Sequence, residues 1–525
     1  MGRGFAASGH AVALRMQVGS QVERGRIVNI LFATSEVVPF SKTGGLADVL
    51  GALPRAMSQL GHRPMVVTPA YRCVHHAGLP LEKTNRSFTV PIGTRTVTGT
   101  YLQSRLPGTD IPVYFVDQPG YYDRPGLYQD QGYDYPDNCE RFVCFCRAAM
   151  ELIRQLGLHV DVLHCNDWQT GLMPAYLRIE YDRVRGYRDL VSVMTIHNMA
   201  YQGQFWHWDM LLTGLDWQYF NWRQLEHWGS LNLLKSGLSF ADAITTVSRR
   251  YADEIQSAPL GCGLESVLRS RHQDLRGIVN GVDYQVWNPH WDAHLPQPYG
   301  LETWESGKAV CKAKLQEEFG LAIAPRTPLI GFVGRLADQK GCDLLEVVMR
   351  EWAPQVDVQW VILGTGQPHF EQRFAELARE YPHRIATRLS FSEPLAHRIE
   401  AGVDLFVMPS RYEPCGLSQL YSLKYGSIPV VRETGGLADT VCDASEDAIA
   451  AGKATGFLFQ PYEVDALRKT LQRAIAIYHE RPAVWRKLVE TGMQQDWSWS
   501  ASARQYMALY EQLLSRHDEH RIRPT

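Results

Sequence analysis

Short, almost continuously apolar runs recur along the chain, separated by longer stretches in which apolar residues return at helical spacing. Runs of this kind are typical of parallel strands that are covered on both faces. Their alternation with helices indicates βαβ units and therefore predicts an α/β fold. The predicted strands are Ile27–Thr34, Arg63–Thr68, Val113–Val116, Val162–Cys165, Ser192–Ile196, Ala243–Val247, Leu329–Val333, Gln359–Leu363, Leu405–Met408 and Ile428–Val431.

The series of strands and helices runs twice. A stretch rich in Pro, Trp, Asn and Gly, without clear periodicity, follows the first series, and a new series begins at Leu329. We therefore predict two doubly wound, Rossmann-like domains facing each other across a deep cleft, over residues 27–285 and 300–490. Ligands bind at the carboxyl ends of the strands in open parallel sheets, so the loops that follow the strands should carry the chemistry.

The two ends of the chain lie outside these domains. Residues 491–525 have a helical pattern and are expected to form a helix that crosses back towards the N-terminal domain. Residues 1–26 carry several Arg but no continuous apolar segment, which argues against a secretory signal. We expect a disordered extension there, with a true start at Met16 or a short organellar presequence as alternatives.

Charge and composition narrow the class of protein. The formal net charge of the 525 residues is −3, which excludes a globally basic nucleic-acid binder. No apolar run approaches the roughly 18 residues that a membrane span needs, so no membrane association is expected. The ten cysteines are scattered without paired CxxC spacing, which is typical of reduced thiols in a cytoplasmic protein.

The first loop with candidate chemistry is Ser41–Leu46, which lies between a predicted strand and a predicted helix, Leu46–Leu60. Gly44 and Gly45 let backbone N–H groups approach an anion closely, and the helix N-terminus adds its dipole. Lys42 adds a full positive charge. The same residues would suit a plain tight turn, and this loop alone favours that alternative.

A second loop, in the C-terminal half, carries two cations. Arg335 and Lys340 follow the apolar strand Leu329–Val333. Such a pair suits a diphosphate, because Arg offers forked hydrogen bonds and Lys a point charge. A solvated basic loop is an equally good interpretation of this segment by itself.

A third loop carries a carboxylate next to a predicted helix N-terminus. Glu413 follows the strand Leu405–Met408 and could face a developing positive charge. The N–H groups of Cys415, Gly416 and Leu417 could face phosphate as the helix begins. The alternative is that Glu413 simply caps that helix.

A fourth group of polar residues ends two strands of the N-terminal half. His197 and Asn198 could hydrogen-bond a polyhydroxylated ligand, and Asp167 occupies a similar place, although a lone His is more often structural. No His, Asp or Glu set has metal-ligand spacing, so we expect neither a catalytic metal nor another cofactor. Any phosphate charge would then be balanced by cationic side chains and backbone dipoles.

Aromatic residues crowd the segment Tyr201–Trp228, which includes Trp206, Trp208, Trp217 and Trp222. Flat rings with polar edges could stack on sugar faces. Packing of the rings in the core is the more ordinary interpretation.

Together, five motifs resemble those of bacterial glycogen synthases and plant starch synthases, in the family's order and from about Ile27 to near Tyr510. The resemblance implies a GT-B fold of glycosyltransferase family 5. It also implies metal-independent, retaining transfer of glucose from ADP-glucose to the non-reducing end of an α-1,4-glucan such as glycogen or starch. The motifs are Lys42–Val49 (KTGGLADV), Thr195–Gly203 (TIHNMAYQG), Asn280–Asp283 (NGVD), Gly334–Gly341 (GRLADQKG) and Glu413–Leu417 (EPCGL).

The resemblance also implies roles for individual residues. Glu413 would lie beside the transferred sugar, His197 would bind the donor glucose near its 6-hydroxyl, and Arg335 and Lys340 would hold the diphosphate. Lys42 would contact the donor phosphate or the acceptor. The remaining implied binding residues are Gly44 and Gly45 by the phosphate, Cys415, Gly416 and Leu417 along the donor, Asp48, Asp167 and Asn198 near the glucosyl or acceptor site, and Asn280 by the cleft.

Two departures from the family leave alternatives open. Phe391 stands where many relatives have Tyr, so stacking on adenine would remain while a hydroxyl is lost, and UDP-glucose stays possible as the donor. Residues 177–190 look like a charged, helical surface insertion.

A glucan phosphorylase would need a pyridoxal phosphate lysine, for which no pattern is seen. A catalytically silent glucan-binding protein would not need all of the charged groups named above.

Overall fold

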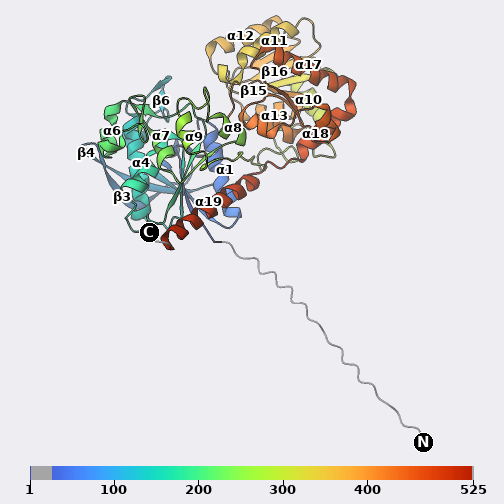
Figure 1. Ribbon diagram of the computed structural model, residues 1–525. Helices are drawn as coiled ribbons and strands as arrows, with labels where there is room; N and C mark the ends of the chain where they lie inside the picture. The colour runs from blue at the N-terminus through green and yellow to red at the C-terminus, as the bar shows by residue number, and fades with distance from the viewer. Residues whose placement is uncertain (2–25, 523–525) are drawn as a thin grey trace.

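The computed structural model describes residue 1 and residues 26–522, and these form two α/β units side by side (Figure 1). The predicted extension over residues 1–26 lies outside the described residues, apart from its two end positions. The N-terminal unit contains β1 to β14 and the C-terminal unit β15 to β20.

The N-terminal unit is built on a nine-stranded sheet with the order β14-β13-β9-β8-β1-β2-β5-β4-β3. Its strands pair in parallel except at the β3–β4 and β4–β5 contacts, where an antiparallel hairpin closes one edge. The strands are β1 (Asn29–Ala33), β2 (Arg63–Pro69), β3 (Glu82–Ile92), β4 (Arg95–Arg105), β5 (Pro112–Asp117), β8 (Val162–Asn166), β9 (Val191–Ile196), β13 (Ala243–Thr246) and β14 (Leu275–Gly277).

Helices and small strands connect and cover this sheet. None of the helices within residues 26–522 is long and apolar enough to cross a membrane. The helices are α1 (Gly45–Gln59), α2 (Arg72–His75), α3 (Pro119–Tyr122), α4 (Asn138–Gln155), η1 (Trp168–Thr170), α5 (Leu172–Ile179), η2 (His207–Asp209), α6 (Met210–Thr213), η3 (Trp217–Tyr219), α7 (Leu233–Phe240), α8 (Arg249–Glu254) and α9 (Glu265–Ser270). The small strands are β6 (Gln129–Asp130), β7 (Tyr133–Asp134), β10 (Gln204–Phe205), β11 (Glu226–His227) and β12 (Ser230–Asn232).

The C-terminal unit has a six-stranded parallel sheet with the order β17-β16-β15-β18-β19-β20. Its strands are β15 (Leu329–Val333), β16 (Gln359–Leu363), β17 (Ile385–Arg388), β18 (Leu405–Met408), β19 (Ile428–Arg432) and β20 (Phe457–Phe459). Its helices are α10 (Trp304–Phe319), η4 (Asp338–Lys340), α11 (Cys342–Trp352), α12 (Pro368–Glu380), α13 (Glu393–Gly402), α14 (Ser418–Tyr425), α15 (Gly435–Thr440), α16 (Glu446–Ala450), α17 (Val464–Glu480) and α18 (Pro482–Gln494).

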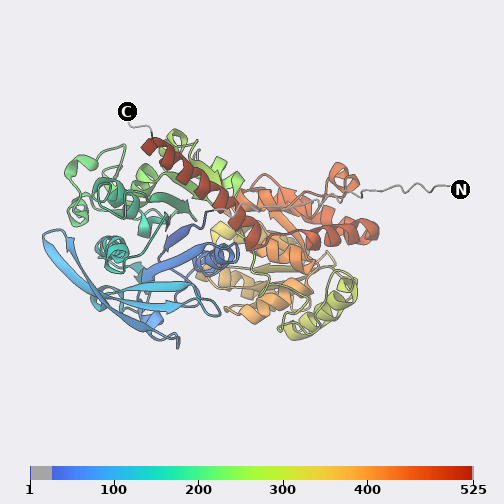
Figure 2. The ribbon, with the colours of Figure 1, turned by 90° about the horizontal axis from the view of Figure 1, so that it is seen from below.

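The last helix, α19 (Trp499–Ile522), leaves the C-terminal unit and packs on α1 of the N-terminal unit (Figure 2). Its Tyr506 and Tyr510 are buried in the N-terminal core, and the Tyr510 hydroxyl lies 2.5 Å from His164 Nδ1. The chain therefore crosses between the units twice. The two crossings lie side by side, because Val282 N donates to Trp497 O at 2.7 Å.

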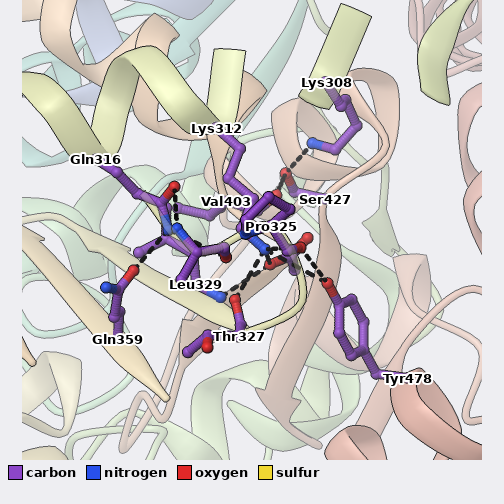
Figure 3. A network of polar contacts seen from close by, with 12 residues as sticks. Lys308, Lys312, Gln316, Pro325, Thr327, Leu329, Gln359, Val403, Ser427 and Tyr478 are labelled. Carbon is purple, nitrogen blue, oxygen red and sulfur yellow. Dashed lines mark hydrogen bonds and ion pairs between the residues drawn. The ribbon is translucent and has the colours of Figure 1, made fainter. Parts of the chain in front are cut away.

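A buried polar network fastens α10 to the C-terminal sheet (Figure 3). Lys312 Nζ lies 2.7 Å from Asp404 Oδ2, and the same carboxylate oxygen accepts from the backbone N–H of Leu329, the first residue of β15. Lys308 Nζ donates to Ser427 Oγ at 2.8 Å, and burial lowers the pKa of Lys308 to about 8. The network thus positions β15, whose carboxyl end leads into the loop with Arg335.

This network predicts a large stability effect. The Lys312→Ala variant should lose about 3–5 kcal/mol of unfolding free energy, because the largely buried carboxylate of Asp404 would lose the cation that it contacts. Guanidinium denaturation followed by circular dichroism measures the loss. Lys314→Ala is the matched control, since the Lys314–Glu317 pair on the same helix is exposed and should change stability by only about 0.5 kcal/mol. Equal losses of unfolding free energy in the two variants would contradict the stabilising role of the Lys312–Asp404 pair.

Candidate active site

Glu413 and Lys340 meet at the carboxyl end of the C-terminal sheet. Lys340 Nζ lies 2.6 Å from Glu413 Oε2, and Ser410 Oγ donates to the same oxygen at 3.1 Å. Glu413 is only 6% exposed. Helix α14 begins at Ser418 without a side-chain cap, so the alternative in which Glu413 caps the helix is wrong.

The loops with Arg335 and Glu413 are held together by their backbones. Arg411 N donates to Gln339 O at 2.8 Å. Gly341 has a φ of 72°, and a Cβ there would lie 2.1 Å from Pro409 O, so the close approach of the two loops requires glycine. The exposed Arg335 donates from Nη2 to Gln339 Oε1 at 2.9 Å, which orients its guanidinium on the same loop.

Cys415 and Asn280 meet where the first crossing approaches this loop. Burial raises the pKa of the Cys415 thiol to about 12, although it accepts a backbone hydrogen bond from Asn280, so Cys415 is a neutral thiol and no nucleophile. Asn280 Oδ1 is buried and has no hydrogen-bond partner among the described residues. Gly416, with a φ of 70°, and Leu417 lead into the uncapped N-terminus of α14.

The start of α15 was not assigned to the site from the sequence, although its Thr434-Gly435-Gly436-Leu437 echoes the Lys42 loop. A Cβ on Gly435 would lie 1.9 Å from Glu413 O, and one on Gly436 would lie 1.9 Å from Cys415 O. Gly436 N donates to Glu413 O at 3.1 Å. These glycines therefore support the loop of Glu413, and the repeated motif was the signal that could have identified them.

The Lys42 loop of the N-terminal unit is arranged differently from the expectation. Lys42 Nζ pairs with Asp48 Oδ1 at 2.7 Å. The buried Glu36 accepts hydrogen bonds from Thr43 N and Gly44 N, at 2.5 and 3.2 Å, so this carboxylate already occupies the amide of Gly44, one of the two glycine amides that were expected to face an anion. A Cβ on Gly44 or Gly45 would meet open space. Glu36 is thus a site residue that the sequence reasoning missed.

His197 and Asp167 lie together at the ends of β8 and β9. Asp167 Oδ1 accepts from His197 N at 2.8 Å. Burial lowers the pKa of His197 to about 3, so its ring is neutral at pH 7. His197 Nε2 lies 2.9 Å from Asn166 Oδ1, while Asn166 Nδ2 donates to Ala33 O. Nε2 therefore carries the proton, and Nδ1 is a hydrogen-bond acceptor. Asn198 Oδ1 accepts from Ala200 N at 3.0 Å, which fixes this turn locally.

The half-buried carboxyl of Asp167 predicts a pH-dependent stability. Burial raises its pKa from 3.8 to about 7, and Glu36 adds to the rise, while the N–H groups of His197 and Asn198 oppose it. The unfolded chain releases this proton near its ordinary pKa, so the native state loses stability as the pH rises from about 4 to about 7. Asp167→Asn should therefore raise the melting temperature at pH 8 and leave it unchanged at pH 4. A difference in melting temperature between Asp167→Asn and the wild type that is the same at pH 4 and pH 8 would contradict the raised pKa of Asp167.

The two sets of loops lie within electrostatic reach of each other. Burial is the main cause of the raised pKa of Asp48; Lys42 opposes it, and Glu393 at the start of α13 adds to it. In the same way, Tyr251 of α8 is influenced by both Asp167 and Tyr412, the neighbour of Glu413. Tyr251 is therefore close enough to both Asp167 and Tyr412 to feel their charges, so residues next to the two groups of loops approach each other at the boundary between the units.

Contacts at the rim hold the two units in this arrangement. Asp439 Oδ2 of α15 accepts from Arg249 N and Arg250 N of α8, at 2.5 and 3.0 Å. Glu254 Oε2, also on α8, accepts from Gly435 N at 3.1 Å. Helix α8 of the N-terminal unit thus packs on α15 of the C-terminal unit.

Phe391 stands apart from the groups described so far. It follows β17 at the same edge of the sheet as Arg335, and it is 85% exposed. Across residues 26–522, no group of three or more His, Cys, Asp and Glu side chains is arranged to hold a metal ion.

Comparison with known proteins identifies the family. Residues 29–270 match the starch synthase catalytic domain, and residues 314–488 match the glycosyl transferases group 1 domain. A glycogen synthase of Rhodopirellula baltica is 45% identical over 498 residues, covering 93% of this chain and 98% of that protein. A glycogen synthase of Anaeromyxobacter dehalogenans is 47% identical over 487 residues, covering 93% and 100%.

The fold agrees with this assignment. The catalytic domain of starch synthase IV from Arabidopsis thaliana, solved with ADP and acarbose bound, superposes with a TM-score of 0.85 at 32% identity, over 93% of this chain and 100% of that one. A sucrose-phosphate synthase from Thermosynechococcus elongatus, 18% identical, shares the fold with a TM-score of 0.57. The chain has the GT-B fold and belongs to the family of glycogen synthases and starch synthases.

Proposed function

We propose that this protein elongates an α-1,4-glucan by transferring glucose from ADP-glucose to its non-reducing end with retention of configuration. The observation that carries the proposal is the ion pair of the buried Glu413 with Lys340, which lies on the same loop as Arg335. A binding protein would have no use for a buried carboxylate and two cations arranged at one place.

The C-terminal unit is the donor side in this proposal. Arg335 and Lys340 hold the diphosphate, with the uncapped N-terminus of α14 and its preceding residues Cys415, Gly416 and Leu417 along the donor. The exposed ring of Phe391 stacks on the nucleobase. The buried Oδ1 of Asn280, which has no hydrogen-bond partner among the described residues, accepts a hydrogen bond from the substrate. This bond would remove the free-energy cost of burying a polar atom without a partner.

The N-terminal unit is the acceptor side. Neutral His197 accepts a hydrogen bond from a hydroxyl of the donor glucose through Nδ1, in the orientation that Asn166 and Asp167 impose. The exposed Lys42–Asp48 pair can exchange its partner for a phosphate or a sugar hydroxyl, with Asn198 nearby. Gly44 and Gly45 leave room for the ligand, because nothing lies within 4 Å of the Cβ positions that they lack.

The reaction is a front-face displacement. The bond between the anomeric carbon and the diphosphate breaks, the acceptor 4-hydroxyl oxygen forms the new bond on the same face, and its proton passes to the departing phosphate. Arg335 and Lys340 stabilise the negative charge that develops on the leaving group, and Glu413 stabilises the positive charge at the anomeric carbon.

Incorporation of radiolabelled glucose into glycogen tests the proposal, with ADP-glucose and UDP-glucose offered separately and EDTA present. We expect label in the polymer from ADP-glucose at the higher rate. Equal or faster transfer from UDP-glucose would contradict the proposal that ADP-glucose is the preferred donor. The absence of transfer from either sugar, with glycogen still bound, would favour a silent glucan-binding protein.

We also propose that the protein works in the cytoplasm. All ten cysteines are free thiols, including the exposed Cys73 and Cys262, which suits a reducing compartment.

A further inference from the structure

A tryptophan of the first crossing between the units is stacked between two helices of the C-terminal unit. The centroid of the Trp287 ring lies 3.7 Å from that of His397 in α13, with the planes 12° apart. On its other face it lies 3.8 Å from the centroid of Tyr421 in α14, with the planes 1° apart. This stack of three rings joins the crossing to both helices, and the function proposed above does not account for it.

A buried carboxylate holds the same arrangement in place. Asp292, also in the first crossing, is 4% exposed, and its Oδ2 lies 2.7 Å from His397 Nδ1. The same oxygen accepts a hydrogen bond from the hydroxyl of Tyr425, the last residue of α14, at 2.5 Å. The ring of Tyr425 meets that of Trp287 edge-on at 6.2 Å. The middle of α14 is thus held by the ring stack, and its C-terminal end by the carboxylate.

Helix α14 also shares a small hydrophobic cluster with the two crossings. Val282 of the first crossing packs there with Leu420 and Leu423 of α14, and these three side chains are at most 2% exposed. Trp287 and, from the second crossing, Trp497 pack against this cluster. The position of α14 therefore depends on the path of the first crossing, and Trp287 takes part in both the stack and the cluster.

The other end of α14 belongs to the donor side of the proposed active site. The helix begins at Ser418 without a side-chain cap, directly after Gly416 and Leu417. Its eight residues span only about 12 Å, so a tilt of the C-terminal end displaces the N–H groups at the start. The attraction between an anion and a helix N-terminus falls off within the first turn, so it depends on where those N–H groups lie.

We propose that Trp287 is a positioning residue for the donor site: its stacked ring holds α14 so that the N-terminus of this helix can bind the diphosphate of the donor. The inference rests on the proposed function, which assigns the diphosphate to this helix. Trp287 acts through α14 and touches no substrate. Its loss should therefore weaken the binding of ADP and ADP-glucose, and it should leave the binding of glucan to the N-terminal unit unchanged.

The test compares Trp287→Ala with a control variant, Trp304→Ala. Trp304, the first residue of α10, is also partly buried against the C-terminal core, but it belongs neither to the ring stack nor to the cluster of Val282. Isothermal titration calorimetry gives the Kd of ADP, and steady-state kinetics gives separate KM values for ADP-glucose and glycogen. All measurements are made below the melting temperatures of the variants, so that the folded proteins are compared.

For Trp287→Ala we expect the Kd of ADP and the KM of ADP-glucose to rise about tenfold, and the KM of glycogen to stay within about twofold of the wild type. Trp304→Ala should change none of the three values by more than about twofold. Trp287→Phe should recover most of the loss, because its smaller ring still stacks between the two helices. Trp287→Leu fills more space than alanine but cannot stack, so it should behave like Trp287→Ala, and it takes its place if the alanine variant does not fold.

Two results would overturn the inference. One is a Kd of ADP for Trp287→Ala, or for Trp287→Leu in its place, that equals that of the wild type. The other is an equal rise in Trp304→Ala, which would show that Trp287 only stabilises the C-terminal unit. ADP binding needs no turnover, so a wild-type protein that binds ADP but transfers no glucose would contradict the proposed function and leave the role of Trp287 standing. A wild type that binds no ADP would contradict both.

Discussion

Replacing Lys340 by alanine should lower kcat by about 10²–10³, the usual loss when one group that stabilises developing charge is removed. Lys340 bridges the expected diphosphate and the buried Glu413, so its removal leaves two negative charges unbalanced in the transition state. Arg335→Ala should lose activity to the same order, because the exposed guanidinium is the other cation of the loop.

Steady-state kinetics with ADP-glucose and glycogen measures the effect, and the melting temperature checks that the fold is intact. Lys453→Ala is a suitable control, since this lysine lies beyond α16, outside the site. A turnover number for Lys340→Ala within about threefold of the wild type would contradict the proposal that Lys340 stabilises the negative charge on the leaving group.

Glu413→Ala should lower kcat by about 10²–10³ as well, through loss of the negative charge that faces the anomeric carbon. Glu413→Gln separates charge from shape, because the amide keeps a hydrogen-bond acceptor for Ser410 but carries no charge. We expect Glu413→Gln to lower kcat nearly as much as Glu413→Ala does.

The double variant Lys340→Ala/Glu413→Ala adds a further check. Because the two side chains are 2.6 Å apart, their effects on kcat should combine to less than the sum of the single losses in free energy. Near-normal turnover of Glu413→Gln, or strict additivity in the double variant, would show that the carboxylate acts only as a support for the loop.

The α/β class and ten of the fifteen strands of the two large sheets were predictable because their signal is local, whereas β3, β4, β14, β17 and β20 were not predicted. Buried parallel strands are apolar without interruption, and each of the ten predicted strands coincides with an observed one to within about two residues. The GT-B fold, implied by motifs such as Lys42–Val49 and Glu413–Leu417, is confirmed by the comparison with starch synthase IV.

Features that depend on contacts between distant segments could not be predicted in this way. The hairpin of β3 and β4 was missed, because its half-exposed strands mix polar and apolar residues. Residues 177–190 were expected to be helical, but α5 ends at Ile179 and a series of turns follows, in which Tyr187 is buried. The segment is charged enough to favour a helix, yet burial of Tyr187 with its hydroxyl on Met150 O fixes a turn instead.

Candidate residues could be chosen by type and place, but their partners could not. Lys340 and Glu413 are 73 positions apart and were assigned separate roles, whereas the fold makes them one ion pair. Glu36 was missed because a single acidic residue after a strand carries no motif, although its carboxylate accepts from the amides of the glycine loop. Core packing was the more ordinary expectation for the aromatic segment, yet Trp206 and Trp228 are exposed, because ring type alone does not tell a surface position from a buried one.

A crystal structure with ADP and a maltooligosaccharide bound together tests the central claim most directly. We predict that the diphosphate lies within hydrogen-bond distance of Arg335 and Lys340. We also predict that the non-reducing end of the glucan lies on the N-terminal side, near His197. A diphosphate bound to the Lys42 loop instead, with Arg335 and Lys340 left in solvent, would contradict the claim.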